Sequence, residues 1–163
     1  MAIAPLNFSG LLKEKPKKGK KPVVISTWHT GTDANKAAWE VLSKGGYALD
    51  AVEKGVMVEE ANPKNITVGY GGRPDRDGNV TLDACVMNED GNCGAVAFLQ
   101  DIMHPVSVAR KVMTETPHSL LVGVGAKKFA LEQGFKETNL LTKKSEEEWE
   151  EWLKNSEYEL EIN

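Results

Sequence analysis

Two consecutive helical patterns, whose apolar stripes consist of small residues, place the strongest limit on how this chain can fold. The stripe of the first pattern has the spacing of one helix face: Ala34, Ala37, Ala38, Val41 and Leu42. The stripe of the second pattern is Ala48, Ala51, Val52, Gly55 and Val56. Gly45-Gly46 and Asn62-Pro63 mark the ends of the two helices. Because alanine and glycine permit close approach, we expect both helices to lie tightly against a neighbouring layer, most simply a β-sheet.

Short β-patterns before and after these helices supply strands for such a sheet. Val23–Ser26 is a continuous apolar run with β-branched residues, as in a strand covered on both faces. Thr81–Met87 and Gly94–Leu99 flank the turn sequence NEDGN and predict a hairpin. The residues SLLVG, 119–123, predict a further strand.

Further helices are predicted in the second half of the chain. One begins at Pro105, which stands in the favoured first position of a helix, and another ends at Gly134. The last begins at Ser145, because Ser145-Glu146-Glu147-Glu148 has the spacing of a capping box. Its apolar face carries Trp149, Trp152 and Leu153. The order of the elements predicts a layered α/β or α+β domain with helices over a mixed sheet.

The charge distribution separates a folded portion from two charged ends. The chain has 163 residues, of which 40% are hydrophobic, enough for a core of single-domain size. Residues 13–21 carry six lysines and one glutamate, whereas residues 145–161 carry eight glutamates and one lysine. We expect a flexible basic arm at 1–21, a folded portion at 22–154 and an acidic tail at 155–163. The lysine run contains no aromatic residue for base stacking, so we do not expect a nucleic-acid partner.

Membrane, metal and cofactor signals are weak in this sequence. No run of about 18 apolar residues is present, and residues 1–22 lack the apolar segment of a secretory signal. Cys85 and Cys93 are too few for a disulfide framework, and we expect two free, largely buried thiols. The spacings of histidine and cysteine do not match a local zinc site. DRDGN and NEDGN resemble calcium loops but are better explained as tight turns. We therefore predict no metal and no cofactor.

Three features of the sequence are candidates for a functional site. Trp28 follows the first apolar run and is either a core residue or the wall of a binding site, with the core favoured on composition alone. The glycine-rich residues GYGG, 69–72, could approach an anion, but a bend or bulge explains them better. Asp83 lies within an apolar strand, and we expect it to be buried; it is either a general base or, as is commoner for such a residue, an anchor for neighbouring backbone or an arginine. No serine or cysteine occupies a nucleophile elbow.

Several long blocks resemble the α-subunits of the glycosylasparaginase family, also called aspartylglucosaminidases or N4-(β-N-acetylglucosaminyl)-L-asparaginases. The blocks are STW, AAWEVLSKGGYALDAVEKG, VGYGGRPDRDGNVTLDACVM, GAVAFLQDIMHPVSVARKVMTETPHSLLVG and FALEQGF. They occur in the order of the family, and the resemblance extends over residues 22–163. It implies the α+β fold of the N-terminal nucleophile hydrolases, a four-layer αββα sandwich, of which this chain would form the α-subunit part.

The resemblance also implies a reaction and a mode of maturation. Members of the family are made as precursors that cut themselves before a threonine, which becomes the N-terminal nucleophile of a separate β-chain. The mature enzymes cleave the bond between an asparagine side chain and N-acetylglucosamine. In this chain the resemblance assigns Trp28 to the substrate site and Thr67 to the support of self-cleavage, with no catalytic residue of its own. It further implies a β-subunit partner in an (αβ)2 heterotetramer, and an exported, periplasmic location in a bacterium or a lysosomal one in an animal.

Two departures from the family pattern leave other hypotheses open. Relatives commonly have an aromatic residue where this chain has Thr30, and often an acidic residue where it has Val124. The first departure keeps a plant-type L-asparaginase or isoaspartyl peptidase α-subunit as an alternative, although such enzymes usually carry a glycine-rich motif in place of STW. A self-contained binding module that uses the GYGG loop is the alternative outside the hydrolases, and it predicts a stable monomer.

Overall fold

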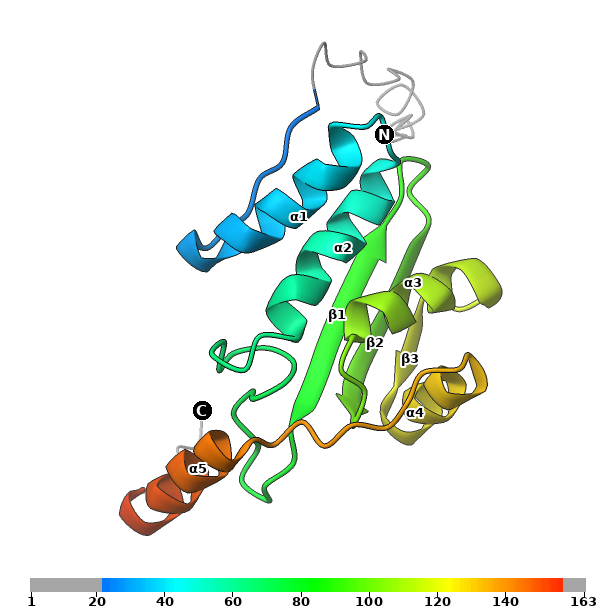
Figure 1. Cartoon of the computed structure of the whole chain (residues 1–163). Coiled ribbons are helices and arrows are strands. Elements are labelled where there is room, and N and C mark those ends of the chain that lie inside the picture. The colour runs from blue at the N-terminus through cyan, green and yellow to red at the C-terminus, as the bar shows by residue number, and fades with distance from the viewer. Residues whose placement is uncertain (1–21, 157–163) are drawn as a thin grey trace, which may run out of the picture.

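The computed structural model describes residues 22–156. Its elements confirm most of the helices and strands expected from the sequence, with bounds that differ by a few residues (Figure 1). In chain order they are η2 (His29–Gly31), α1 (Thr32–Leu42), α2 (Ala48–Glu60), β1 (Thr81–Met87), β2 (Cys93–Gln100), α3 (Pro105–Glu115), β3 (Leu120–Val122), α4 (Gly123–Glu132) and α5 (Lys143–Asn155). The basic arm predicted at 1–21 and nearly all of the acidic tail predicted at 155–163 lie outside the described residues.

The sheet of the described residues is mixed and has three strands in the order β1-β2-β3. β1 and β2 form the predicted antiparallel hairpin, which turns at Asn88–Asn92, where the Gly91 N–H donates to the Asn88 carbonyl at 3.1 Å. β2 and β3 are parallel and are connected through α3. Because β1 and β3 are the outer strands, each presents one edge that no strand of the described residues pairs with.

Helices cover one face of this sheet and build the main core. α3 contacts β1, β2 and β3, and α4 packs beside it on β2 and β3. The core joins residues from the inner faces of the strands to residues of the helices: Leu49, Val86, Val96, Leu99, Val108, Val112 and Ala126. These side chains come from α2, both strands of the hairpin, α3 and α4, so one apolar core unites the elements.

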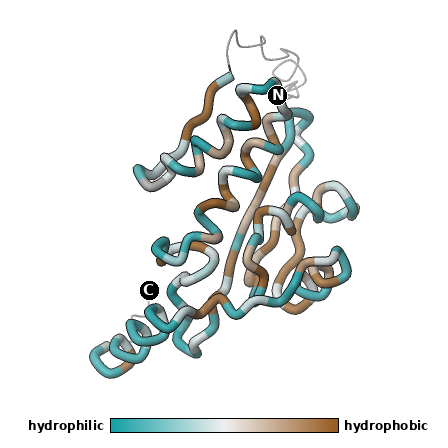
Figure 2. Tube along the Cα trace, viewed as in Figure 1, coloured by the Kyte–Doolittle hydropathy of each residue, from teal (hydrophilic) through white to brown (hydrophobic). Residues whose placement is uncertain are grey.

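The opposite face of the sheet is apolar and exposed. The strand register places Cys85 and Leu120 on this face with Ala95 between them, and Met87 opposite Cys93. Met87 is 67% exposed and Phe98 is 51% exposed, although both are large and apolar. Apolar residues follow the course of the strands in the hydropathy view of the trace (Figure 2). We call this surface, formed by Cys85, Met87, Cys93, Phe98, Leu120 and Val122, the outer sheet face.

The outer sheet face explains two differences from expectation. Cys85 and Cys93 are free, as predicted, but they are exposed and not buried, because their strand positions point away from the helices. Asp83 is likewise exposed. Its carboxylate does anchor backbone, as predicted, by accepting the Phe98 N–H at 2.8 Å beside a register shift between Leu82 and Ala84.

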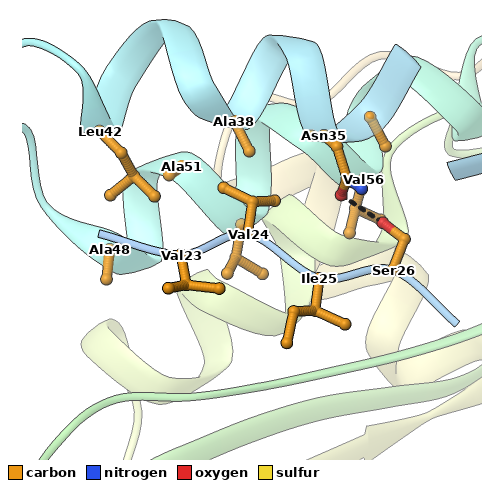
Figure 3. Close-up of a pocket in the computed structure, with 13 residues that line it drawn as sticks. Val23, Val24, Ile25, Ser26, Asn35, Ala38, Leu42, Ala48, Ala51 and Val56 are labelled. Carbon is orange, nitrogen blue, oxygen red and sulfur yellow. Dashed lines mark hydrogen bonds between the residues drawn. The ribbon is translucent and has the colours of Figure 1, made fainter. Parts of the chain in front are cut away.

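The segment Val23–Ser26 is extended but does not form the predicted buried strand. Ile25 is 86% exposed, and no strand among the described residues pairs with this segment. It lies along an apolar groove of about 330 Å³ formed with α1 and α2 (Figure 3). The small-residue stripes of the two helices therefore face each other and this segment, and not a sheet as expected. A Cβ at Gly55 would lie 2.8 Å from the Ala34 carbonyl oxygen, which explains the need for small residues here.

The last helix begins earlier than the sequence pattern suggested. Its N-cap is Thr142, and Ser145 takes the reciprocal position of the capping box, so the prediction of Ser145 as the cap was wrong. The Thr142 hydroxyl competes successfully because it reaches the Ser145 N–H, at 3.3 Å, while the Ser145 hydroxyl accepts the Thr142 N–H at 3.0 Å. Trp149 holds α5 against the DRDGN turn, where its Nε1–H donates to the Arg76 carbonyl at 3.3 Å. Among the described helices, none has the length and apolar character needed to cross a bilayer.

Candidate functional site

Trp28 lies on the surface at the end of the extended segment. Its side chain is 75% exposed, so the interpretation of Trp28 as a core residue was wrong. The backbone is extended at Trp28 and turns immediately afterwards, with the Gly31 N–H donating to the Trp28 carbonyl at 2.9 Å. The indole is therefore presented outward from a tight bend that leads into α1.

Ser26 holds this bend against the first turn of α1. Its hydroxyl donates to Asn35 Oδ1 at 2.5 Å, as the dashed line in Figure 3 marks. Gly31 packs on the same side chain, since a Cβ at Gly31 would lie 2.7 Å from Ser26 Oγ. The serine and glycine of STWHTG thus fix the backbone on both sides of Trp28, which limits the directions that its ring can take.

Thr67 lies on the loop that follows α2, and its side chain is exposed. Its hydroxyl donates to Asn65 Oδ1 at 2.6 Å, and its backbone N–H donates to the same oxygen at 3.2 Å. The Arg73 N–H closes the base of the loop by donating to the Ile66 carbonyl at 3.0 Å. The loop therefore presents one hydroxyl from a backbone that is held at both ends.

The backbone N–H groups of Tyr70, Gly71 and Gly72 donate to carbonyls of the protein, so the GYGG motif does not offer an anion site. The N–H of Tyr70 donates to the Glu60 carbonyl at 2.7 Å, that of Gly71 to Leu140 at 2.8 Å and that of Gly72 to Gly69 at 3.1 Å. Gly69 and Gly71 both have positive φ, at 60° and 86°. The interpretation of this motif as a bend that allows close backbone packing is confirmed.

The fold brings the neighbourhoods of Trp28 and Thr67 to one end of the helix pair. α1 and α2 pack against each other and run in opposite directions (Figure 1). The start of α1, which follows Trp28, and the end of α2, which precedes Thr67, are therefore adjacent ends. That the two side chains serve one substrate site remains a prediction.

Glu60 is a buried polar residue that the sequence analysis did not single out. Its side chain is 4% exposed; Oε1 accepts the Val106 N–H at 3.0 Å, and Oε2 lies 3.1 Å from His104 Nδ1. A glutamate is unfavourable at the C-terminus of its own helix, α2, but favourable at the N-terminus of α3. An acidic residue at the end of a predicted helix was therefore the signal available in the sequence. Glu60 connects α2, the GYGG loop and α3.

The candidate site offers the hydroxyl of Thr67 and the indole of Trp28, but no nucleophile with a base beside it among the described residues. Within 22–156, no group of three or more histidine, cysteine, aspartate or glutamate side chains is arranged to hold a metal ion. Thr67 has no base beside it, since its partner is the neutral amide of Asn65. Trp28 and Thr67 therefore offer an exposed ring and an exposed hydroxyl for contact with another molecule.

Comparison with known proteins adds the family. The sequence profile of a protein family described as asparaginase matches residues 10–163. The chain is 59% identical to an N(4)-(β-N-acetylglucosaminyl)-L-asparaginase of Elizabethkingia miricola over 164 residues, which cover 100% of this chain and 48% of that protein. It is 45% identical to the proteins of the same name in Mus musculus and Rattus norvegicus over 133 residues, which cover 81% of this chain and 38% of each relative. The chain thus spans less than half the length of these relatives, and it belongs to the asparaginase family.

Proposed function

We propose that this chain is the α-subunit part of a glycosylasparaginase. The enzyme would cleave the N4-(β-N-acetylglucosaminyl)-L-asparagine linkage of glycoasparagines and release aspartate and the amino sugar. The observation that carries the proposal is the 59% identity, over the whole of this chain, to a relative with that named activity. The match extends across all described elements and so includes the blocks around Trp28 and Thr67.

The proposed partner is a β-subunit derived from the same precursor. The outer sheet face supports it, since large apolar side chains exposed together mark an interaction surface. The free edge of β1 and the exposed Val23–Ser26 segment support it too, because unpaired strand edges invite further strands. Helices on one face of a sheet and apolar residues on the other form half of the four-layer αββα sandwich that we propose for the assembled enzyme. An (αβ)2 heterotetramer is the proposed assembly.

The proposed mechanism divides the work between the two subunits. Self-cleavage frees a threonine at the start of the β-chain, and its α-amino group acts as the base for its own hydroxyl. The hydroxyl attacks the side-chain amide carbonyl of the substrate to form an aspartyl ester, and the glycosylamine leaves. Water then hydrolyses the ester to release aspartate, with donors of the β-chain stabilising each oxyanion. Trp28 forms a wall of the substrate site, and Thr67 stands beside the nucleophile and supports self-cleavage.

Replacement of Trp28 tests its part in this proposal. Because the ring is 75% exposed, Trp28→Ala is expected to change the unfolding midpoint little. It should raise KM for a glycoasparagine by about tenfold, the loss expected for one aromatic contact with substrate. Trp39→Ala is a matched control, since Trp39 is also exposed, at 47%, but lies within α1. Unchanged KM and kcat in a correctly processed Trp28→Ala enzyme would refute the wall role.

Two further measurements test the activity and the maturation. The complete open reading frame, expressed and purified, should yield two chains, the second of which begins with threonine. A single uncut chain with full activity would contradict the autocleavage proposal. Faster hydrolysis of free L-asparagine than of a glycoasparagine would favour the plant-type asparaginase alternative. For a bacterial source we propose an exported, periplasmic location, which cell fractionation tests.

A further inference from the structure

We propose that Asn65 is a positioning residue that sets the direction of the Thr67 hydroxyl proton, under the control of Glu59. The inference rests on the proposed role of Thr67 beside the nucleophile. Three side chains form a continuous hydrogen-bonded row. Asn65 Nδ2 donates to Glu59 Oε2 at 3.0 Å, and Thr67 Oγ1 donates to Asn65 Oδ1 at 2.6 Å.

The polarity of this row follows from what each group can donate. A carboxylate only accepts hydrogen bonds, so the amide end of Asn65 that faces Glu59 must be the NH2 group. The carbonyl end of Asn65 then faces Thr67 and also accepts the Thr67 backbone N–H at 3.2 Å. An amide carbonyl cannot donate, so the Thr67 hydroxyl has to give its only proton to Asn65. The acid on α2 thereby dictates the hydroxyl orientation two side chains away.

The consequence is that Thr67 acts toward an incoming group as an acceptor. With its proton committed to Asn65, the exposed side of Oγ1 presents lone pairs. Such an oxygen binds an amine or hydroxyl donor, and it cannot donate to a carbonyl oxygen on which negative charge develops. Thr67 is therefore excluded from an oxyanion hole and suited to receive a hydrogen bond from a donor of the nucleophilic threonine.

Hydrogen bonds hold the backbone around Thr67, so the Thr67 hydroxyl is the part of the loop that can rotate. Ile66 is fixed by the Arg73 N–H at 3.0 Å, and the Glu60 carbonyl holds the Tyr70 N–H at 2.7 Å. Glu59 itself belongs to the last turn of α2. Loss of Asn65 would therefore leave Thr67 in place but free its hydroxyl to rotate and to donate outward.

A double-mutant cycle on the complete protein, with kcat calculated per processed molecule of each variant, tests the role of Asn65. Asn65→Ala is expected to lower kcat about fivefold, with KM nearly unchanged, as for loss of one orienting hydrogen bond. In a Thr67→Ala background the same change should alter kcat by less than about twofold, because no hydroxyl remains to orient. An equal fold-loss in both backgrounds would show that Asn65 only supports the loop, and would overturn the proposal.

Asn62→Ala is the matched control for the loop. Asn62 Oδ1 accepts the Lys64 N–H at 3.1 Å, a bond within the same loop that matches the one that the Thr67 N–H donates to Asn65 Oδ1. We expect this variant to retain kcat within about twofold of the wild type. A fivefold loss in Asn62→Ala as well would show that any weakening of the loop suffices, which would contradict a specific role for Asn65.

Exchange of the carboxylate and the amide between Glu59 and Asn65 tests the control by Glu59. Asn65→Asp alone places two carboxylates against each other and should lower kcat, since their repulsion displaces the acceptor. The double variant Glu59→Gln/Asn65→Asp restores a donor opposite an acceptor, and the carboxylate introduced by Asn65→Asp would still accept from Thr67. Recovery of kcat to within about twofold of the wild type is expected. No recovery in the double variant would overturn the control by Glu59.

The outcome also separates this inference from the proposed function. If Thr67→Ala is processed and active like the wild type, the role of Thr67 is wrong and the inference falls with it. If Thr67→Ala is impaired while Asn65→Ala is not, the role of Thr67 stands and only the orientation by Asn65 is refuted.

Discussion

Replacement of Gly69 by alanine would test whether the GYGG loop requires its close approach to the end of α2. Gly69 has a φ of 60°, and a Cβ built on it would overlap the Glu60 carbonyl oxygen. The same Cβ would lie 2.5 Å from the Glu60 Cα and 2.6 Å from its carbonyl carbon. All three are backbone atoms, so no side-chain rotation relieves the overlap. Glu60 cannot withdraw easily, because its buried carboxylate also holds the Val106 N–H at 3.0 Å.

The expected cost has two parts that a control variant can separate. A left-handed backbone at a residue with a Cβ costs about 1 kcal/mol. Displacement of packed neighbours adds about 1–3 kcal/mol, so Gly69→Ala should lower the free energy of unfolding by about 2–4 kcal/mol. Gly91 has a similar φ of 83° in the hairpin turn, but nothing lies within 4 Å of the place where its Cβ would be. Gly91→Ala should therefore cost only the backbone part, about 1 kcal/mol.

Urea unfolding of the complete protein and of both variants measures these costs from the midpoints at a common slope. We expect Gly69→Ala also to reduce activity, because the displaced loop carries Thr67, whereas Gly91→Ala retains it. Equal destabilisation of the two variants would refute the reasoning, since it would show that the contact with Glu60 does not limit the loop.

Two more substitutions test local features of the fold. Thr142→Ala should lower the free energy of unfolding by about 1 kcal/mol and speed amide exchange in the first turn of α5, because Ser145 loses its reciprocal cap. Thr142→Ser serves as the control, and unchanged amide exchange in Thr142→Ala would refute the cap. Hydrogen bonds to Asp101, and then to Glu137, raise the pKa of Lys127 above its ordinary 10.5. Lys127→Met should lower the free energy of unfolding by about 0.5–1 kcal/mol at pH 7. The difference in free energy of unfolding between the wild type and Lys127→Met should persist to about pH 10 and shrink above it as the ammonium deprotonates. A difference that stays constant up to about pH 12 in urea unfolding would contradict the ion pairs.

Local signals in the sequence were sufficient for most elements. The spacing of small apolar residues predicted α1 and α2, and NEDGN predicted the hairpin of β1 and β2. Pro105 predicted the first residue of α3. These signals act within a few residues, so they do not depend on the rest of the fold. The start of α5 was missed by a few residues, because Thr142 and Ser145 are both competent caps and only backbone geometry chooses between them.

Burial could not be predicted in the same way. An apolar run such as Val23–Ser26 indicates a strand that prefers cover, but it does not say whether a second layer lies within the chain. The same holds for Cys85, Cys93 and Asp83, which alternate correctly along their strands and nevertheless face outward. Burial depends on which elements meet each face of a sheet, and that is a property of the tertiary structure and not of a single segment.

The candidate site shows the same division. The sequence by itself determined that Trp28 ends an apolar segment and that Thr67 opens a glycine-rich bend, since both are statements about neighbouring residues. Only the tertiary structure decided that Trp28 is exposed and that Glu60 bridges to Val106, 46 positions away. Only it decided that Asn65 stands between Glu59 and Thr67. The physical reason is that a periodic pattern records the preferences of a chain segment. A hydrogen bond between side chains and other residues forms only when packing has set every dihedral angle between the two partners.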